Sequence, residues 1–209
     1  MDPKRIVAAG YDRIGDAYAR WTATGRTTAR DRYTELILDT LPPGASLLEL
    51  GCGAGVPTTK RLAERFAVTG VDISARQIER ARANVPHATF LNADMTAVDF
   101  PSASFDAVVA FYSIIHVPRE EHGPLLRAIV SWLGPGGWLV AAMGARGDSG
   151  TIEDDWLGTP MFFSHHDTAT NRRLVEEAGL QIVRAVEETE DEDGQPVTFL
   201  WVVARKPGG

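Results

Sequence analysis

Apolar residues follow two alternating spacings along the chain from residue 47 onward. Short apolar runs, which are typical of buried strands, occupy residues 47–50, 68–71, 88–91, 107–111 and 138–143. Between these runs, apolar residues recur at helical spacing, most clearly around Leu125 and Ile129. Ser74 and Gln77 form a capping-box pattern at the start of one such helix. Helices between buried strands predict crossover connections, and therefore an α/β fold whose parallel sheet is covered on both faces.

The end of the chain departs from this alternation. A helix that Asp167 should cap and Gly179 should end precedes two strand-like runs at residues 180–186 and 197–204. Only an acidic turn that contains glycine and proline separates the two runs, and we expect it to be a solvated loop. The runs should therefore pair antiparallel, which completes a seven-stranded, mostly parallel sheet with a C-terminal hairpin.

Two segments lie outside the strand pattern. Residues 1–42 predict helices. Residues 144–166 lack a clear period, although they contain aromatic residues such as Trp156 and Phe163. Because ligands of open α/β sheets bind beyond the carboxyl ends of the strands, we expect both segments to cover that edge.

The composition is that of a soluble globular domain. The chain has 209 residues, 44% of them hydrophobic and 23% charged, which predicts one domain with a sizeable core. The apolar runs are too short to cross a bilayer, and the first residues lack the apolar stretch of a secretory signal, so we expect a cytoplasmic protein without a membrane partner. The single cysteine, Cys52, excludes an internal disulfide and a cysteine-rich zinc site. A formal net charge of −7 disfavours nucleic acid as a partner.

The strongest chemical signal is a glycine-rich turn at the end of the first predicted strand. Gly51, Gly53 and Gly55 follow that strand and open a helix, where backbone can approach a ligand closely. Asp72 ends the next strand, at about the 20-residue separation that nucleoside-binding α/β folds place before a ribose-binding carboxylate. Asp94 follows the third strand. Acids at successive strand ends should line one crevice, so the sequence predicts a nucleoside site.

Five segments together carry a family resemblance, and they read LLELGCGAG, VTGVDIS, NADM, FDAVVAFYSIIHV and LGPGGWLVAAM. In this order they resemble the class I S-adenosylmethionine-dependent methyltransferases, and in particular the small-molecule branch that includes ubiquinone and menaquinone biosynthesis enzymes. YDRIGDAYARW is similar to the N-terminal cap of that branch. The resemblance implies a Rossmann-like fold for one domain over residues 1–209. Its parts would be a helical cap at 1–42, a cofactor-binding core at 43–144, a substrate-side insert at 145–166, and a terminal helix and hairpin at 167–209.

The resemblance implies S-adenosylmethionine as cofactor and S-adenosylhomocysteine as product. The residues that it places against the cofactor are Tyr18, Gly51, Cys52, Gly53, Asp72, Ile73, Asp94, Met95 and Phe111. Asp72 would bind the ribose hydroxyls and Asp94 the adenine amino group, with Ile73 and Met95 against the adenine ring. The glycine turn would pass under the methionine part and the ribose, and the backbone near Phe111 would face the methionine amine. Tyr18 would close the site from above and donate to the cofactor carboxylate.

Histidines supply the candidates for a catalytic base. His116 follows the fourth strand, whose end lies beside the transferable methyl group in this fold, and His165 ends the insert that should cover the same pocket. Each is a candidate general base if the acceptor must lose a proton, and a structural role stays open for both. Metal binding by His165, His166 and Asp167 is disfavoured because adjacent residues rarely converge on one ion. We expect His122 to be solvated.

The function these residues favour is methyl transfer to a small, partly apolar or aromatic metabolite by in-line displacement, in specialised metabolism. Two alternatives stay open: a nicotinamide-dependent oxidoreductase, and a non-methylating descendant of the same fold. The Gly-x-Gly-x-Gly spacing departs from the dinucleotide pattern, which weakens the first. The segment Phe111–Ile114 lacks the Asn/Asp-Pro-Pro-Tyr motif of the family's adenine and glutamine amide methylators, so a small molecule is the expected partner of a monomer or homodimer.

Overall fold

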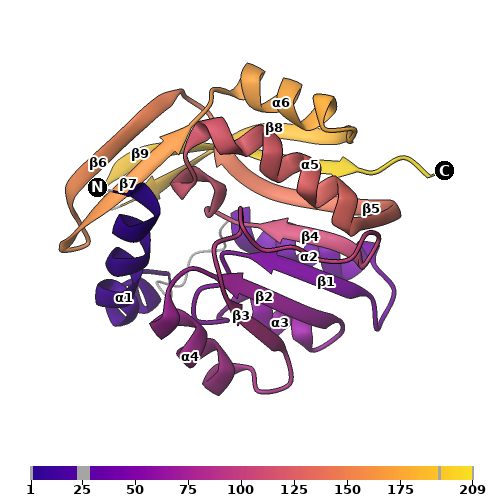
Figure 1. The fold of residues 1–209 in the computed structure, drawn as a ribbon, viewed down its shortest axis with the longest axis horizontal. Helices are drawn as coiled ribbons and strands as arrows, with labels where there is room; N and C mark the ends of the chain where they lie inside the picture. The colour runs from indigo at the N-terminus through magenta and orange to yellow at the C-terminus, as the bar shows by residue number, and fades with distance from the viewer. Residues whose placement is uncertain (1, 23–28, 193, 209) are drawn as a thin grey trace.

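The computed structural model describes residues 2–22, 29–192 and 194–208, and within the first range it describes side chains as far as Gly15. In this part of the chain a seven-stranded sheet has the order β3-β2-β1-β4-β5-β9-β8 (Figure 1). Its strands are β1 (Ser46–Leu50), β2 (Ala67–Asp72), β3 (Thr89–Asn92), β4 (Phe105–Ala110), β5 (Leu133–Gly144), β8 (Gln181–Glu192) and β9 (Gln195–Arg205). The strands β1 to β5 pair in parallel, and β9 pairs antiparallel with both β5 and β8. The predicted sheet, including its terminal hairpin, is confirmed.

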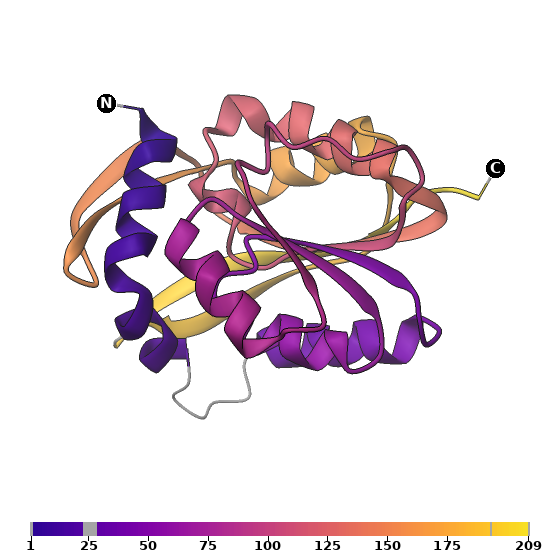
Figure 2. The ribbon, with the colours of Figure 1, turned by 60° about the horizontal axis from the view of Figure 1, so that its bottom comes forward.

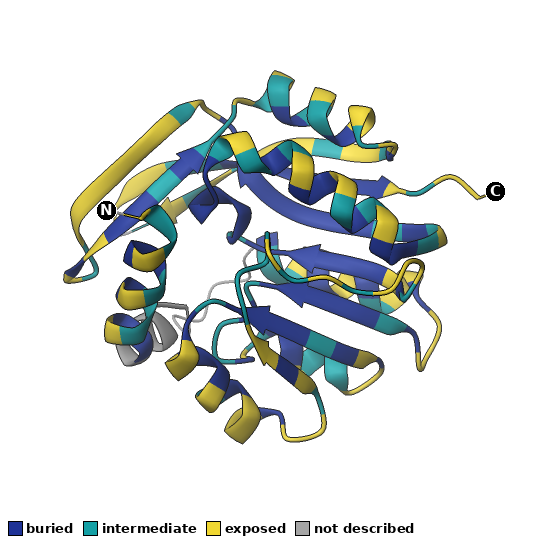
Figure 3. Ribbon diagram, in the orientation of Figure 1, coloured by how far each residue is buried: buried dark blue, intermediate teal, exposed yellow. Residues whose placement is uncertain are grey.

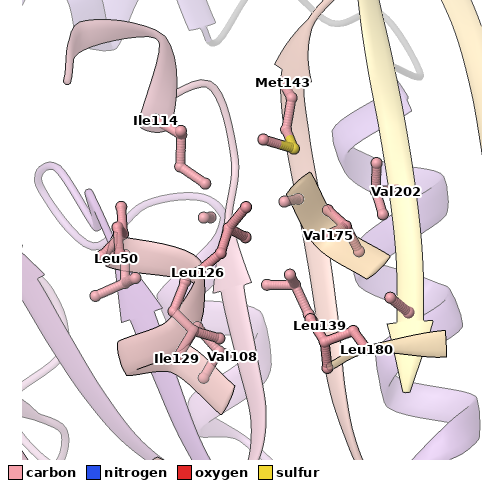
Figure 4. Close-up of a cluster of buried hydrophobic side chains, with 14 of the residues drawn as sticks. Leu50, Val108, Ile114, Leu126, Ile129, Leu139, Met143, Val175, Leu180 and Val202 are labelled. Carbon is pink, nitrogen blue, oxygen red and sulfur yellow. The ribbon is translucent and has the colours of Figure 1, made fainter. Parts of the chain in front are cut away.

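Helices cover both faces of the sheet, as the alternating pattern predicted (Figure 2). The helices are α2 (Ala29–Thr40), α3 (Thr58–Ala63), α4 (Ala75–Asn84), α5 (His122–Trp132) and α6 (Thr168–Glu177). Side chains of α5 and α6 pack on one face in the cluster that Figure 4 draws, with Leu126, Ile129 and Val175 against Leu139 and Val202. A second cluster packs α2 and α3 against the opposite face.

Two predicted helix boundaries are confirmed by their hydrogen bonds. The side chain of Ser74 accepts from the backbone N–H of Gln77 at 3.1 Å at the start of α4. The side chain of Asp167 accepts from the N–H of Thr170 at 2.8 Å at the start of α6. Both bonds satisfy a first-turn N–H group that the helix leaves without a partner.

A helix and a hairpin cover the carboxyl ends of the parallel strands. The helix is α1 (Pro3–Thr22), and the hairpin joins β6 (Asp148–Trp156) to β7 (Thr159–His165). Ile6, Val7 and Ile14 of α1 form an apolar cluster with Met161 and Phe162 of β7, apart from the two clusters of the sheet. Figure 1 shows α1 between this hairpin and α4. Within the described residues no helix has both the length and the apolar character needed to span a bilayer.

The hairpin is a correction to the prediction of an aperiodic insert over residues 144–166. Most of β6 is exposed, as Figure 3 shows, so the strand lacks the alternation of apolar and polar residues that marks a half-buried strand. Its turn also lacks the usual Asn-Gly or Asp-Gly signal. Leu157 and Gly158 both have positive φ, at 52° and 87°, which is the geometry of a two-residue hairpin turn with an unusual first residue.

Two further predictions are wrong. The acidic run from residue 187 is not a solvated loop, because it continues β8 as far as Glu192. There Glu188 accepts a hydrogen bond from the hydroxyl of Tyr33 at 3.1 Å, which ties the strand to α2. His122 is not solvated either, since it is 1% exposed and its Nε2 lies 2.9 Å from the carbonyl of Val117.

Candidate functional site

A cavity of about 650 Å³, including its opening to solvent, lies where α1 covers the carboxyl ends of the parallel strands. Its size is within the range of small-ligand sites. Eight predicted site residues line it: Gly51, Gly53, Asp72, Ile73, Asp94, Met95, Phe111 and His116. The sequence prediction did not include the other lining residues, which are Lys4, Val7, Tyr11, Val71, Ala93, Tyr112, Ser113 and Val117. The strand ends therefore bring the predicted acids and glycines to one place.

The glycine turn between β1 and α3 forms the floor of the cavity. Gly51 has φ +75°, and a Cβ atom there would clash with the side chain of Ser113. Ser113 Oγ donates to the carbonyl of Leu50 at 2.7 Å, which fixes the segment after β4 against the turn. At Gly53, with φ +53°, a Cβ would meet nothing within 4 Å, so the space above it is open. An elongated ligand can therefore lie directly over the backbone of this turn.

The carboxylate of Asp72 lies at the end of β2, beside the glycine turn. It accepts from the N–H of Gly53 at 2.8 Å and from the N–H of Ser74 at 2.9 Å. Burial raises the pKa of Asp72 to about 6, although these two backbone hydrogen bonds act in the opposite direction. Ser74 Oγ donates to Asp12 of α1 at 2.6 Å. A ribose that donates its hydroxyls here would stabilise the charged carboxylate, which fits a nucleoside ligand.

Asp94 holds an ion pair with the start of α1. Lys4 Nζ lies 2.8 Å from Asp94 Oδ2, and it also donates to Glu121 at 2.6 Å and to Thr96 at 2.6 Å. Burial raises the pKa of Asp94, but the hydrogen bonds from Lys4 and Thr96 outweigh it and hold the pKa below its usual value. Asp94 is thus an ionised hydrogen-bond acceptor on the cavity wall, beside the apolar side chain of Met95.

His116 lies on the short 3₁₀ helix η1 (Ile114–His116), which follows β4. Its Nδ1 is 2.8 Å from the carbonyl of Phe162, and its Nε2 is 2.9 Å from the hydroxyl of Tyr11. Since a carbonyl can only accept, Nδ1 carries the proton and Nε2 accepts from Tyr11. Burial lowers the pKa of His116 to about 4 and outweighs the bond to Phe162. The imidazole is therefore neutral at physiological pH.

The second predicted base, His165, does not line the cavity. It is the last residue of β7, and its ring lies so close to Gly144 of β5 that a Cβ at that glycine would clash with it. Its Nδ1 contacts the carbonyl of Arg146. The hairpin thus directs His165 toward β5, and the predicted gathering of both histidines in one pocket is wrong.

Two of the predicted cofactor contacts, Cys52 and Tyr18, are not among the described residues that line the cavity. The side chain of Cys52 is 6% exposed and packs with Ile78, Ala81 and Phe90, outside the cavity lining. Burial raises the pKa of its thiol well above the usual value, which favours the neutral thiol. The side chain therefore packs in the core, while the backbone of Cys52 is part of the glycine turn. Tyr18 belongs to α1, but its side chain lies outside the described part of the structure.

Glu49 links the end of β1 to α3 beside the glycine turn. It is 4% exposed at the end of β1, and its Oε2 accepts from Thr59 Oγ1 of α3 at 2.6 Å. Burial raises its pKa to about 7, against the effect of the nearby Arg30 and of the bond from Thr59. Among the described residues, no group of three histidine, cysteine or acidic side chains is arranged to hold a metal ion.

Comparisons with known proteins identify the family and the fold. A family model described as a methyltransferase domain matches residues 47–137. A 2-methyl-6-phytyl-1,4-hydroquinone methyltransferase of Synechocystis is 31% identical over 238 residues, which cover 97% of this chain and 73% of the relative.

Two solved structures share the fold. Magnesium protoporphyrin IX methyltransferase of Synechocystis, with bound S-adenosylhomocysteine, has a TM-score of 0.75 and 18% identity and covers 98% of this chain and 100% of its own. The cyclase SpnF has a TM-score of 0.77 and 19% identity and covers 100% of this chain and 98% of its own.

The chain therefore belongs to the S-adenosylmethionine-dependent methyltransferases, and S-adenosylmethionine is the cofactor of that family. The cavity fits that group: the turn leaves open space above Gly53, and two buried or partly buried carboxylates stand at adjacent strand ends. The family assignment does not favour the nicotinamide-dependent alternative.

Proposed function

We propose that this enzyme methylates a small apolar or aromatic metabolite, and that its cavity holds the donor along the strand ends with the methyl group toward His116. The observation that carries the proposal is the lining of one cavity by Gly53, Asp72, Asp94 and the Tyr11–His116 pair. The carboxylates supply acceptors for a nucleoside at one end. The Tyr11–His116 pair supplies a polar contact at the other.

The donor positions follow the order of the strand ends. We assign the ribose hydroxyls to Asp72, the adenine amine to Asp94, and the adenine ring to the space between Ile73 and Met95. The methionine part then lies over Gly51, Cys52 and Gly53 and against the backbone of Phe111. The contact of Tyr18 with the donor carboxylate stays a prediction from the resemblance. The burial of Asp72 and the open space above Gly53 support the assignment.

The bound donor supplies a methyl group on a sulfonium that is already reactive. The protein's main task is therefore to hold the acceptor in line and to keep water out, and orientation of this kind can supply about 7–11 kcal/mol of the barrier. Val7 and Tyr11 of α1 cover the cavity, and α1 is held on both sides through Lys4 and Asp12. This cover supports a closed reaction space.

Tyr11 and His116 form the proton-transfer pair in this proposal. As the acceptor atom bonds to the methyl carbon, the bond from that carbon to the sulfonium sulfur breaks and its electron pair stays on the sulfur. The proton of the acceptor passes to the oxygen of Tyr11, and the hydroxyl proton of Tyr11 passes to Nε2 of His116. The bond from Nδ1 of His116 to the carbonyl of Phe162 keeps Nε2 available as an acceptor. An acceptor without a proton to lose would need only alignment by the same pair. His165 has no part in this step because it lies outside the cavity lining.

The apolar character of the covering elements supports an aromatic or partly apolar acceptor. Trp156 and Phe163 of the hairpin contact His116, with ring centroids at 6.2 Å and 4.8 Å. These two rings lie behind His116 and outside the cavity lining, which itself includes Val7, Phe111 and Val117. Apolar and aromatic surroundings with few polar groups are typical of sites for such ligands. The hydroquinone and porphyrin named for two similar proteins are acceptors of this kind. We further propose that nucleic acid is not a substrate and that the enzyme is a cytoplasmic monomer or homodimer.

Two binding and transfer measurements test this function. Calorimetry should detect S-adenosylhomocysteine at micromolar concentrations and no binding of nicotinamide cofactors at the same concentrations. The purified enzyme with isotope-labelled donor should then transfer label to members of a panel of hydroquinones, phenols and apolar amines, detected by mass spectrometry. Donor binding without transfer to any class of acceptor would favour the non-methylating descendant instead.

A further inference from the structure

Tyr112 occupies an unusual place on the cavity wall. It lies between Phe111 and Ser113 in the segment that follows β4, and all three residues line the cavity. Its φ is +56°, in the left-handed region that residues with a Cβ adopt rarely. Such a conformation persists only where surrounding contacts determine it. The contacts of the Tyr112 side chain therefore control the shape of this wall.

Those contacts come from three separate parts of the chain. The hydroxyl of Tyr112 donates to Glu190 Oε2 of β8 at 2.7 Å. The guanidinium carbon of Arg30 on α2 lies 4.9 Å from the centre of the Tyr112 ring, within the range of a cation–π interaction. The ring also meets Phe199 and Trp201 of β9 edge-on, at centroid distances of 4.8 Å and 5.4 Å.

Glu190 joins the wall to the start of a helix. While its Oε2 accepts from Tyr112, its Oε1 accepts from the backbone N–H of Ala29, the first residue of α2, at 2.9 Å. A carboxylate at a helix N-terminus satisfies a first-turn N–H group and interacts favourably with the helix dipole. The same carboxylate thus fixes Tyr112 and the end of α2 that carries Arg30. Glu190 itself does not line the cavity.

From this arrangement we infer that Glu190 is a positioning residue for the methionine end of the donor. It acts through Tyr112, whose hydroxyl it holds, and so sets the backbone of Phe111 and Ser113 against the glycine turn. The inference rests on the proposed donor orientation, in which the methionine part lies along this wall. It assigns to the acidic C-terminal hairpin a role in donor binding, although no residue of that hairpin lines the cavity.

Glu188 provides a matched control on the same strand. It also faces α2, where it accepts from the hydroxyl of Tyr33 at 3.1 Å and pairs with Arg32, but neither partner lines the cavity. Loss of the Glu188 carboxylate removes contacts between β8 and α2 and leaves the hydrogen bond of Tyr112 in place. A difference between the variants Glu190→Gln and Glu188→Gln therefore separates positioning of the wall from general support of the hairpin.

The test is calorimetric binding of S-adenosylhomocysteine to the wild type, Glu190→Gln, Tyr112→Phe, their double variant and Glu188→Gln. We expect Glu190→Gln and Tyr112→Phe each to weaken binding about five- to tenfold, as loss of one buried hydrogen bond does. The double variant should bind S-adenosylhomocysteine no more weakly than the weaker-binding single variant, because both substitutions remove the same hydrogen bond. In steady-state kinetics the donor KM should rise while kcat at saturation stays the same. Glu188→Gln should bind as the wild type does.

Wild-type affinity in both Glu190→Gln and Tyr112→Phe, or an equal loss in Glu188→Gln, would overturn the inference. Tyr112→Phe measures the same bond if Glu190→Gln fails to fold. Absence of S-adenosylhomocysteine binding by the wild type would instead contradict the proposed donor site on which the inference rests, so the two failures are distinguishable.

Discussion

The hydroxyl of Tyr11 lies 2.9 Å from Nε2 of His116, although the two residues are 105 positions apart in the sequence. Tyr11 belongs to the helix that covers the cavity, and His116 to the segment that follows β4. The position of α1 therefore completes the polar end of the cavity. The neutral state of His116, with a pKa of about 4, makes its Nε2 an acceptor rather than a donor in this pair.

Replacing either member of this pair should slow methyl transfer without weakening donor binding. For an acceptor that loses a hydroxyl proton, His116→Asn and Tyr11→Phe should each lower kcat by about 100-fold or more, because the proton then lacks a receiving group. Affinity for S-adenosylhomocysteine, measured by calorimetry, should stay near that of the wild type. His165→Asn is the control, and we expect it to retain kcat since His165 lies outside the cavity lining.

The pH profile adds a second readout for His116. Because burial holds its pKa near 4, the imidazole stays neutral at higher pH, and kcat should show no step from His116 between about pH 5 and 9. A step near its ordinary pKa that disappears in His116→Asn would contradict the buried, neutral assignment. If both Tyr11→Phe and His116→Asn kept the wild-type kcat, the proton-transfer role of the pair would be contradicted, and alignment of donor and acceptor alone would account for catalysis.

Donor affinity should depend on pH through Asp72, whose pKa is about 6 without ligand. Ribose hydroxyls donate to the charged carboxylate, so binding favours its ionised form and lowers its pKa. Affinity for S-adenosylhomocysteine should therefore be lower at pH 5, rise through pH 6 and level off above about pH 7. Calorimetry in buffers of different ionisation enthalpy should detect proton release at the lower pH values.

Asp72→Ala is the control for this titration. It should lower the affinity at least about tenfold at pH 8, because two charge-assisted hydrogen bonds are lost. It should also flatten the pH dependence. An unchanged slope in a folded Asp72→Ala variant would show that another group, such as Glu49 with its pKa of about 7, carries the titration.

The cover formed by α1 should respond to the donor. Lys4 and Asp12 hold α1 to Asp94 and Ser74, which adjoin the proposed adenosine positions. Hydrogen exchange in residues 4–15 should therefore slow when S-adenosylhomocysteine binds, since opening of the helix must precede release of the ligand. Lys4→Met should exchange faster and release the ligand faster. Identical exchange with and without ligand would contradict a cover that is coupled to binding.

Local patterns predicted most of the fold. The buried strands, the caps at Ser74 and Asp167, and the glycine turn each depend on residues close together in sequence, so periodicity and spacing identify them. The hairpin of residues 148–165 was missed for a physical reason. Its first strand is exposed at nearly every position, so the alternation of apolar and polar residues is absent. Its turn begins with a leucine at positive φ, so the usual Asn-Gly or Asp-Gly signal is absent as well.

The site was predictable only in part. Asp72 and Asp94 were found because parallel strands end at one edge of the sheet. The contacts of Lys4, Tyr11 and Glu190 could not be predicted. Each joins segments whose relative placement depends on the packing of the covering helix or of the terminal hairpin. A single sequence carries no signal for such long-range pairs. The expectation that His165 covers the same pocket as His116 fails because the sequence does not show the direction of β7.

The donor orientation is the central claim, and a crystal structure of the enzyme with S-adenosylhomocysteine tests it most directly. We predict ribose oxygens within hydrogen-bond distance, about 3 Å, of the Asp72 carboxylate, and the adenine amine within the same distance of Asp94. The sulfur atom should face the cavity end that Tyr11 and His116 form. An adenosine bound elsewhere, or a ribose whose hydroxyls contact groups other than Asp72, would contradict the account.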